Sequence, residues 1–201
     1  MDEFTLSYKS EGKYHEKGSK FSALAIPVSN VTEVKENLQK LKEIFSDASH
    51  ICYGYRIKEG ERLDEFATDA GEPKGSSGLP ILNVLKRNQI VDAVIFVARY
   101  FGGSKLGIPG LINAYGTAAE GTIENAKIKK WVQLERISFI YNYDLQNKVD
   151  SILQKYKVNI IKSDFGESIQ VELEIDIGKN EELNKELKEV SNGTIRVIQV
   201  F

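Results

Sequence analysis

Cysteine and histidine are nearly absent from this sequence of 201 residues, which has one cysteine, Cys52, and two histidines, His15 and His50. A single cysteine excludes an intrachain disulfide and is typical of a protein from a reducing compartment. Two isolated histidines do not make the Cys/His cluster that a zinc site needs. We therefore expect a chain that folds without cross-links and that has neither a metal nor a cofactor.

Long apolar runs and an excess of one charge are missing too. The longest apolar stretch, at 93–98, has the length of a strand, and the first residues are polar and acidic. We therefore expect no membrane span and no signal peptide, and a cytoplasmic location. Through Leu134 there are 18 basic and 17 acidic residues, and after it 9 and 12. Neither part has the basic excess of a protein that binds nucleic acid over a broad surface, so such binding would need a local cluster.

The composition, with 41% hydrophobic and 28% charged residues, is that of a globular protein of one large or two small domains. The hydrophobic pattern restarts after the basic stretch at 127–130, so we predict an α+β chain of two domains, 1–131 and 132–201. Trp131 would pack at the junction, where the basic residues form a linker rather than an RNA contact.

In the first domain, alternating and helical patterns predict six elements. They are a strand at 20–28, a helix from an N-cap at Thr32 to about Phe45, a strand at 50–57, a helix at 79–88, a strand at 91–98 and a helix at 109–126. The charged segment 58–65 is predicted to be an exposed turn.

In the second domain, the patterns predict strand, helix, two strands, helix and a closing strand, which is the ferredoxin-like βαββαβ order. Its third strand, at 169–177, would turn Ile177 inward and Glu172 and Glu174 outward. Because carboxylates repel phosphate, this outward face is a poor platform for RNA and a better surface for protein contacts.

Glycines gather in two loops around the strand at 91–98. The first loop, DAGEPKGSSGLP, carries Asp69, Glu72 and Lys74 among small turn residues, and the second, RYFGGSKLG, leads into a helix. Backbone N–H groups at the start of a helix favour an anion, and basic side chains would add charge. The candidate site for a phosphate-like anion or other ligand consists of Asp69, Glu72, Lys74, Arg99, Tyr100, Gly102, Gly103 and Lys105. The alternative is that the glycines only permit tight turns, since neither a Walker nor a dinucleotide motif is present.

Cys52 and His50 are two residues apart in a strand and would share a face, which leaves a nucleophilic pair as a minor hypothesis. Free cysteines are commonly buried, and no third group that would orient the pair is visible. A buried structural thiol is therefore the preferred interpretation, and we assign no catalytic residue.

Four segments together carry a family resemblance: SHICYGYRI, DAGEPKGSSGLPIL, RYFGGSKLG and GLINAYG. They resemble the IMPACT/YigZ family from about Lys17 to Ala126, and the remainder resembles the C-terminal domain of bacterial members. Four positions depart from the usual family residues, namely Ala70, Leu79, Pro109 and Asn113. The resemblance implies a left-handed βαβ fold, shared with a ribosomal protein domain and a domain of elongation factor G, for the first part of the chain. It also implies a likeness of the second part to the last domain of elongation factor G.

The resemblance further implies a function, because eukaryotic relatives bind a regulator of translation in the response to amino-acid starvation. Our leading hypothesis is a translation-associated binding protein that contacts the ribosome, RNA or a translation-regulating protein through the two glycine loops. One alternative is an enzyme for a small phosphorylated or nucleotide substrate, with Asp69 or Glu72 as base or metal ligand and Arg99 and Lys105 on the phosphate. The other alternative is a protein–protein adaptor.

Overall fold

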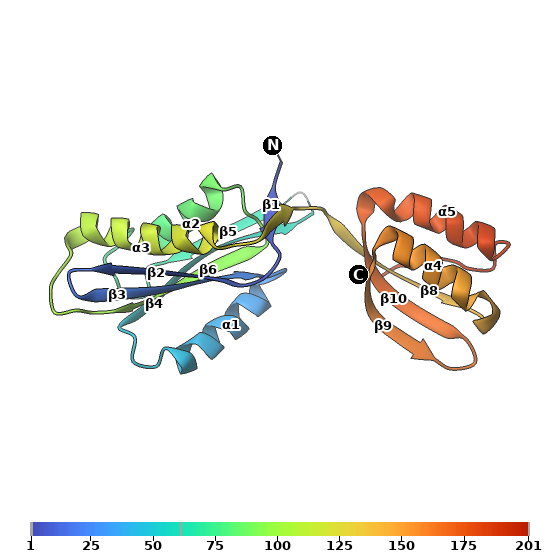
Figure 1. Cartoon of the computed structure of the whole chain (residues 1–201), viewed down its shortest axis with the longest axis horizontal. Helices are drawn as coiled ribbons and strands as arrows, with labels where there is room; N and C mark the ends of the chain where they lie inside the picture. The colour runs from blue at the N-terminus through green and yellow to red at the C-terminus, as the bar shows by residue number, and fades with distance from the viewer. Residues whose placement is uncertain (1, 61, 201) are drawn as a thin grey trace. The chain divides into compact units, whose positions relative to one another are not determined.

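The computed structural model describes residues 2–60 and 62–200, and the chain divides into two compact units, 1–131 and 132–201. Each unit is a β-sheet with helices packed on it (Figure 1). This combination of helices with antiparallel sheets is the α+β class that the sequence predicts.

The first unit contains a five-stranded sheet in the order β2-β3-β6-β4-β5, in which all neighbours are antiparallel. The strands are β2 (Ser10–Glu16), β3 (Ser19–Pro27), β4 (His50–Glu59), β5 (Arg62–Thr68) and β6 (Ala93–Tyr100). Because β3 and β4 both pair with β6, they run parallel to each other, and α1 (Val31–Ile44) connects them. The β3–α1–β4 segment is therefore a βαβ crossover around a central strand.

Helices cover both faces of this sheet (Figure 1). Val94 and Phe96 of β6 pack in a cluster with residues of α1. Ile95 and Val97 pack on the other side with α2 (Gly78–Arg87) and α3 (Gly107–Glu124). Since successive strand residues point to opposite faces, a strand covered on both sides is a continuous apolar run, as β6 is.

Helix α1 begins two residues earlier than an N-cap at Thr32 would place it. The N-cap is Asn30, whose side-chain oxygen accepts a hydrogen bond from the backbone N–H of Glu33 at 2.9 Å. The Glu33 carboxylate in turn accepts one from the backbone N–H of Ser29. Asparagine is a stronger N-cap than threonine, and Glu33 stands three positions after Asn30, as in a capping box.

The segment 58–65, predicted to be an exposed turn, is instead largely strand. β4 continues to Glu59 and β5 starts at Arg62. The charge of Glu65 is paired rather than only solvated, because its carboxylate binds Arg56 at 2.9 Å and Lys86 of α2 at 2.5 Å. Edge strands commonly carry charged residues, and this property concealed β5 in the sequence.

Two short strands close the first unit. β1 (Phe4–Leu6) pairs antiparallel with β7 (Ile128–Lys130), so part of the predicted linker is a strand. Trp131 follows directly, and its indole Nε1 donates a hydrogen bond to Asp92 Oδ2 at 2.5 Å. Lys58 lies over the Trp131 ring, 4.3 Å from its centroid. Trp131 is thus bound to the first unit.

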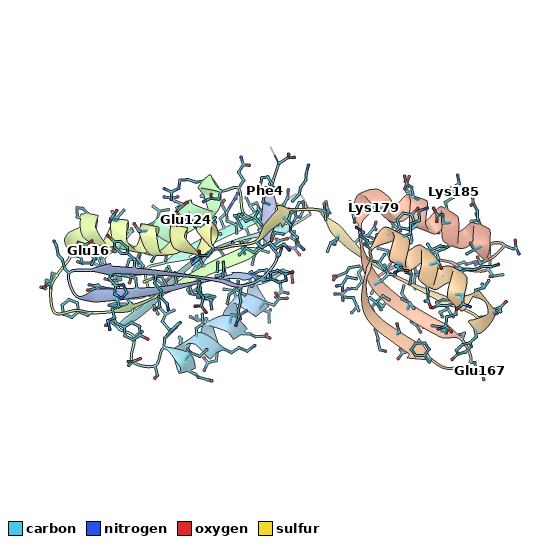
Figure 2. The ribbon with its side chains drawn as sticks, viewed as in Figure 1. Phe4, Glu16, Glu124, Glu167, Lys179 and Lys185 are labelled. Atoms are coloured by element: carbon cyan, nitrogen blue, oxygen red, sulfur yellow. The ribbon has the colours of Figure 1, made fainter. Side chains whose placement is uncertain are left out.

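The second unit has the ferredoxin-like order β8-α4-β9-β10-α5-β11, which confirms the sequence prediction. Its four-stranded antiparallel sheet is ordered β11-β8-β10-β9. The elements are β8 (Leu134–Tyr141), η1 (Tyr143–Leu145), α4 (Gln146–Tyr156), β9 (Asn159–Phe165), β10 (Ile169–Asp176), η2 (Ile177–Lys179), α5 (Asn180–Val190) and β11 (Ile198–Gln199). In Figure 2, Glu167 marks the tip of the hairpin between β9 and β10.

Strand β10 alternates as predicted over most of its length. Ile169, Val171, Leu173 and Ile175 are buried in the core, while Glu172 and Glu174 lie on the other face. The prediction for Ile177 is wrong, since this side chain is 48% exposed. β10 ends at Asp176, whose carboxylate accepts a hydrogen bond from the Gly178 backbone N–H and starts the η2 turn.

Candidate functional site

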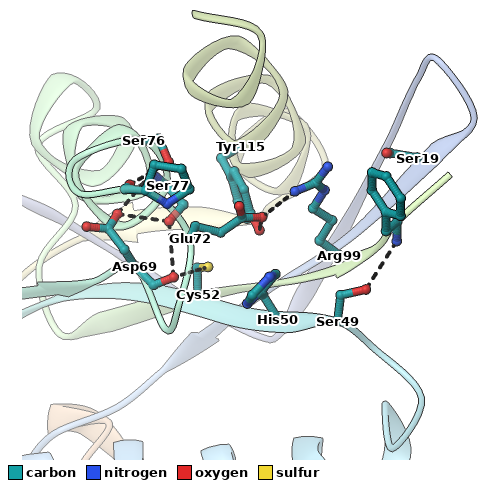
Figure 3. Close-up of polar contacts among 12 residues, drawn as sticks. Ser19, Ser49, His50, Cys52, Asp69, Glu72, Ser76, Ser77, Arg99 and Tyr115 are labelled. Atoms are coloured by element: carbon teal, nitrogen blue, oxygen red, sulfur yellow. Dashed lines mark hydrogen bonds and ion pairs between the residues drawn. The ribbon is translucent and has the colours of Figure 1, made fainter. Parts of the chain in front are cut away.

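The two glycine loops lie at the end of β6 and carry different chemistry. The first loop joins β5 to α2, and the second joins β6 to α3. Figure 3 shows the polar contacts that connect them to β4 and to α3.

Asp69 holds the first loop in place. Its Oδ1 accepts hydrogen bonds from the backbone N–H of Ser77 at 3.0 Å and of Gly78 at 2.9 Å, and its Oδ2 accepts one from Gly75 at 2.8 Å. Partial burial alone would raise the pKa of Asp69, but these hydrogen bonds outweigh burial and lower it. The carboxylate therefore occupies the anion position at the start of α2.

Glu72 and Arg99 form a buried ion pair. Arg99 Nη1 lies 2.6 Å from Glu72 Oε1, and the side chains are 8% and 4% exposed. The hydroxyl of Tyr115, a fully buried residue of α3, donates to the same Oε1 at 2.8 Å. The Arg99 guanidinium also lies 5.7 Å from the Phe21 ring and 5.5 Å from the Phe101 ring. Arg99 is consequently a structural partner that links both loops to α3.

Cys52 and His50 do not form a nucleophilic pair. Cys52 is fully buried, and its Sγ donates to the Asp69 carbonyl at 3.0 Å. Burial raises the pKa of the Cys52 thiol to about 11. His50 Nδ1 instead lies 2.9 Å from the carbonyl oxygen of Ala70. The preferred interpretation, a buried structural thiol, agrees with this geometry.

The second loop is anchored at its first residues. The backbone N–H of Phe101 donates to Ser49 Oγ at 3.3 Å, and that of Gly102 donates to Ser19 Oγ at 3.2 Å. A Cβ at Gly102 would lie 1.9 Å from the backbone of Gly18, so only glycine fits where the loop crosses the β2–β3 turn. Gly102 is therefore required because two backbone segments approach each other closely at this position.

The rest of the second loop is open. Residues 103–105 are exposed, and within the described chain the backbone N–H groups of residues 103–106 donate no hydrogen bond. Gly103 has φ +87°, a conformation that favours glycine. Helix α3 then starts with no side chain capping it. Lys105 therefore lies beside a series of unsatisfied backbone donors.

The structure places six of the eight predicted residues in two groups and leaves Lys74 and Tyr100 outside both. Asp69, Glu72 and Arg99 converge, and both carboxylates are engaged in structural contacts. Gly102, Gly103 and Lys105 belong to the second loop, Gly102 to its anchored start and Gly103 and Lys105 to its open part. Lys74 is exposed, and within the described residues its side chain forms no hydrogen bond or ion pair with either group. Tyr100 follows Arg99 and so points to the opposite face, where burial and then the Asp47 carboxylate raise its pKa.

Sequence reasoning did not identify Tyr115 and Ser19 as site residues. Tyr115 falls within the predicted helix at 109–126, and the one signal for a polar role was a large hydroxyl-bearing residue among glycines and alanines. Ser19 lies 83 positions before Gly102, so no local pattern could join them. No group of three or more histidine, cysteine, aspartate or glutamate side chains in residues 2–60 and 62–200 is arranged to hold a metal ion. No helix of this part of the chain is long and apolar enough to span a membrane.

Two known protein-family models match this chain, one in each unit. The model of the Impact N-terminal domain matches residues 17–123, and that of a domain of unknown function (DUF1949) matches residues 139–194. The first match covers more than half of the chain, which therefore belongs to the IMPACT family, as its motifs predict.

Relatives align over nearly the whole chain. The IMPACT family member YvyE of Bacillus subtilis (strain 168) is 28% identical over 190 residues, which cover 94% of this chain and 87% of YvyE. The IMPACT family member YigZ of Escherichia coli (strain K12) is 23% identical over 185 residues, covering 92% and 91%. A crystal structure of a hypothetical protein aligns with a TM-score of 0.69 at 21% identity, over 100% of this chain and 98% of that one, and supports the two-unit fold.

Proposed function

We propose that this protein is a translation-associated binding protein whose second glycine loop, residues 101–106, contacts phosphate groups of ribosomal or other structured RNA. The link to translation rests on the membership of the IMPACT family and on the role that the resemblance to eukaryotic relatives implies. The mode of binding rests on the geometry of the loop.

One observation carries the proposal: the backbone N–H groups of residues 103–106 have no partner in the described chain and lie beside Lys105 at an uncapped helix start. Four adjacent donors, a helix N-terminus and one flexible cation are what a phosphate oxygen requires. The start of α2 offers a contrast, since its backbone donors already bind the Asp69 carboxylate. Of the two helix starts, only that of α3 is open to an external anion.

The role of Arg99 in this proposal differs from the one expected from the sequence. Because Arg99 is buried with Glu72, it does not contact the anion but fixes the end of β6 from which the loop departs. Lys105 is then the basic side chain that contacts RNA. The small number of contacts predicts weak and salt-sensitive binding, in agreement with the nearly neutral first unit.

Co-sedimentation with ribosomes at several salt concentrations tests this proposal. Lys105→Ala should weaken binding and reduce the slope of log affinity against log salt by about 0.9, the contribution of about one phosphate contact. Lys40→Ala is the matched control, because Lys40 is exposed on α1, which covers the opposite face of the sheet. If both variants sediment like the unmodified protein, RNA binding through this loop is excluded and the protein–protein adaptor becomes the better hypothesis.

A further inference from the structure

Strand β9 is an exposed edge of the second unit's sheet. Among the described residues it pairs with β10 alone, and six of its seven residues are exposed. Three of these are large and apolar: Ile160 is 51% exposed, Ile161 43% and Phe165 66%. An edge strand presents unpaired backbone N–H and C=O groups, and an apolar edge favours pairing with another strand.

The two faces of β9 differ in character. Phe165 and Ser163 lie opposite Ile169 and Val171 of β10, on the side of the core. Lys162 and Asp164 lie opposite Glu172 and Gln170, on the open face of the sheet. Their side chains are 63% and 56% exposed, and Nζ of Lys162 lies 2.6 Å from Oδ2 of Asp164. A β-bulge makes Ile161 an extra residue without a partner in β10.

We propose that β9 pairs antiparallel with β9 of a second copy of this chain, about a two-fold axis at Ser163. In this register, Lys162 of each copy lies opposite Asp164 of the other, and Ile161 of each lies opposite Phe165 of the other. The strand is thus complementary to itself in charge on one face and in apolar character on the other, as a two-fold interface requires.

Neighbouring registers lack this complementarity. An axis at Lys162 or at Asp164 would place two like charges opposite each other, which is destabilising. An axis between two residues would pair positions of opposite faces, such as Lys162 with Phe165, whereas directly opposed residues of an antiparallel pair share a face. Only the axis at Ser163 gives opposite charges and paired apolar side chains together.

The interface consists of two edge strands, so the dimer should be weak and dependent on concentration. It uses the second unit, whereas the proposed anion loop belongs to the first. Lys105→Ala should therefore leave the dimer unchanged, and failure of either proposal does not imply failure of the other.

Disulfide trapping tests the register. Directly opposed residues of an antiparallel pair have Cβ atoms about 4.5–5.5 Å apart, close enough for a disulfide after a small adjustment. Ser163→Cys in the full chain should form a covalent dimer under mild oxidation. Ser151→Cys, on the exposed surface of α4, is the control, and Cys52 is buried in both variants. Equal dimer yields from the two variants, or none from Ser163→Cys, would overturn the proposal.

Charge exchange gives a second test that does not depend on a cysteine. K162D and D164K should each be monomeric by sedimentation velocity at concentrations where the unmodified protein dimerises, because each places like charges across the axis. An equimolar mixture of the two variants restores opposite charges at both pairs and should form the heterodimer. Monomeric unmodified protein at high concentration, or a mixture that does not associate, would contradict the proposed pairing.

Discussion

Nη1 of Arg99 and Oε1 of Glu72 lie 2.6 Å apart in a site where both side chains are almost fully buried. Glu72 belongs to the first loop, and Arg99 lies at the end of β6, 27 positions further along the chain. Their pairing explains why an arginine at the end of β6 is structural rather than a surface cation. Because the second loop starts directly after β6, Glu72 of the first loop also helps to fix the position of the second loop.

Removing the charge of Glu72 should therefore destabilise the fold. Glu72→Gln leaves the Arg99 guanidinium buried without a counter-charge, and breaking a buried pair in this way costs about 3–5 kcal/mol in the free energy of unfolding. Urea denaturation measures the loss. Glu120→Gln is the control, because the pair of Glu120 with Arg87 is largely exposed and should contribute about 0–1 kcal/mol. If both variants lose similar amounts of unfolding free energy, the buried pair does not contribute more to stability than the exposed pair.

Asp69 should make stability depend on pH in the acid range. Burial raises its pKa, but the hydrogen bonds from Gly75, Gly78 and Ser77 outweigh this effect, so the folded pKa lies below the ordinary value of 3.8. The stabilising contribution is therefore complete above that value and is lost as the pH falls through the folded pKa.

Asp69→Asn keeps the shape but removes the charge, and should cost about 1.5–3 kcal/mol at neutral pH. The difference in the free energy of unfolding between this variant and the unmodified protein should become smaller below about pH 4, where Asp69 becomes protonated. Urea denaturation at several pH values measures both effects, with Asp150→Asn, on the exposed surface of α4, as control. A difference that stays constant down to pH 2 would contradict the account.

The two adjacent glycines of the second loop should respond differently to alanine. At Gly102 a Cβ would lie 1.9 Å from the Gly18 backbone, whereas at Gly103 nothing lies within 4 Å and only the positive φ is unfavourable. Overpacking makes Gly102→Ala the more costly change, at about 3 kcal/mol. Gly103→Ala should cost about 1–2 kcal/mol. Thermal denaturation of the two variants shows which substitution costs more stability. A larger loss of stability for Gly103→Ala than for Gly102→Ala would be inconsistent with the described loop.

Cys52 should be unreactive in the folded protein. Its side chain is fully buried, and burial raises the pKa of the thiol to about 11, so almost no thiolate is present at neutral pH. A thiol-specific chromogenic reagent should titrate no thiol in the native protein and one after unfolding in urea. Rapid reaction of the folded protein would instead support a reactive cysteine.

The elements that the sequence predicted well are those with strong periodicity and a buried face. β6 is a continuous apolar run, and β10 alternates strictly, so each could be recognised without its neighbours. β5 and β7 were not recognised as strands, because their exposed and charged residues follow the pattern of turns and linkers. Their pairing depends on strands elsewhere in the chain, which no local pattern describes.

The candidate site was only partly predictable for a related reason. The glycine density and the basic residues showed where the loops are, but not which charges are already paired. Arg99 and Lys105 are both basic residues of the segment RYFGGSKLG, and the sequence does not distinguish them. In the fold, Glu72 binds both Arg99 and Tyr115, whereas Lys105 is exposed. Long-range contacts therefore decide which residue can contact a ligand.

The central claim is that residues 103–106 bind an anion, and an NMR titration of the full chain with inorganic phosphate tests it most directly. We expect saturable shifts of the backbone amide signals of Gly103, Ser104 and Lys105, with weaker binding in Lys105→Ala and unchanged binding in Lys40→Ala. Amide signals of Ser77 and Gly78, whose donors bind Asp69, should not move. Shifts confined to other surfaces, or a titration that Lys105→Ala leaves unchanged, would contradict the account.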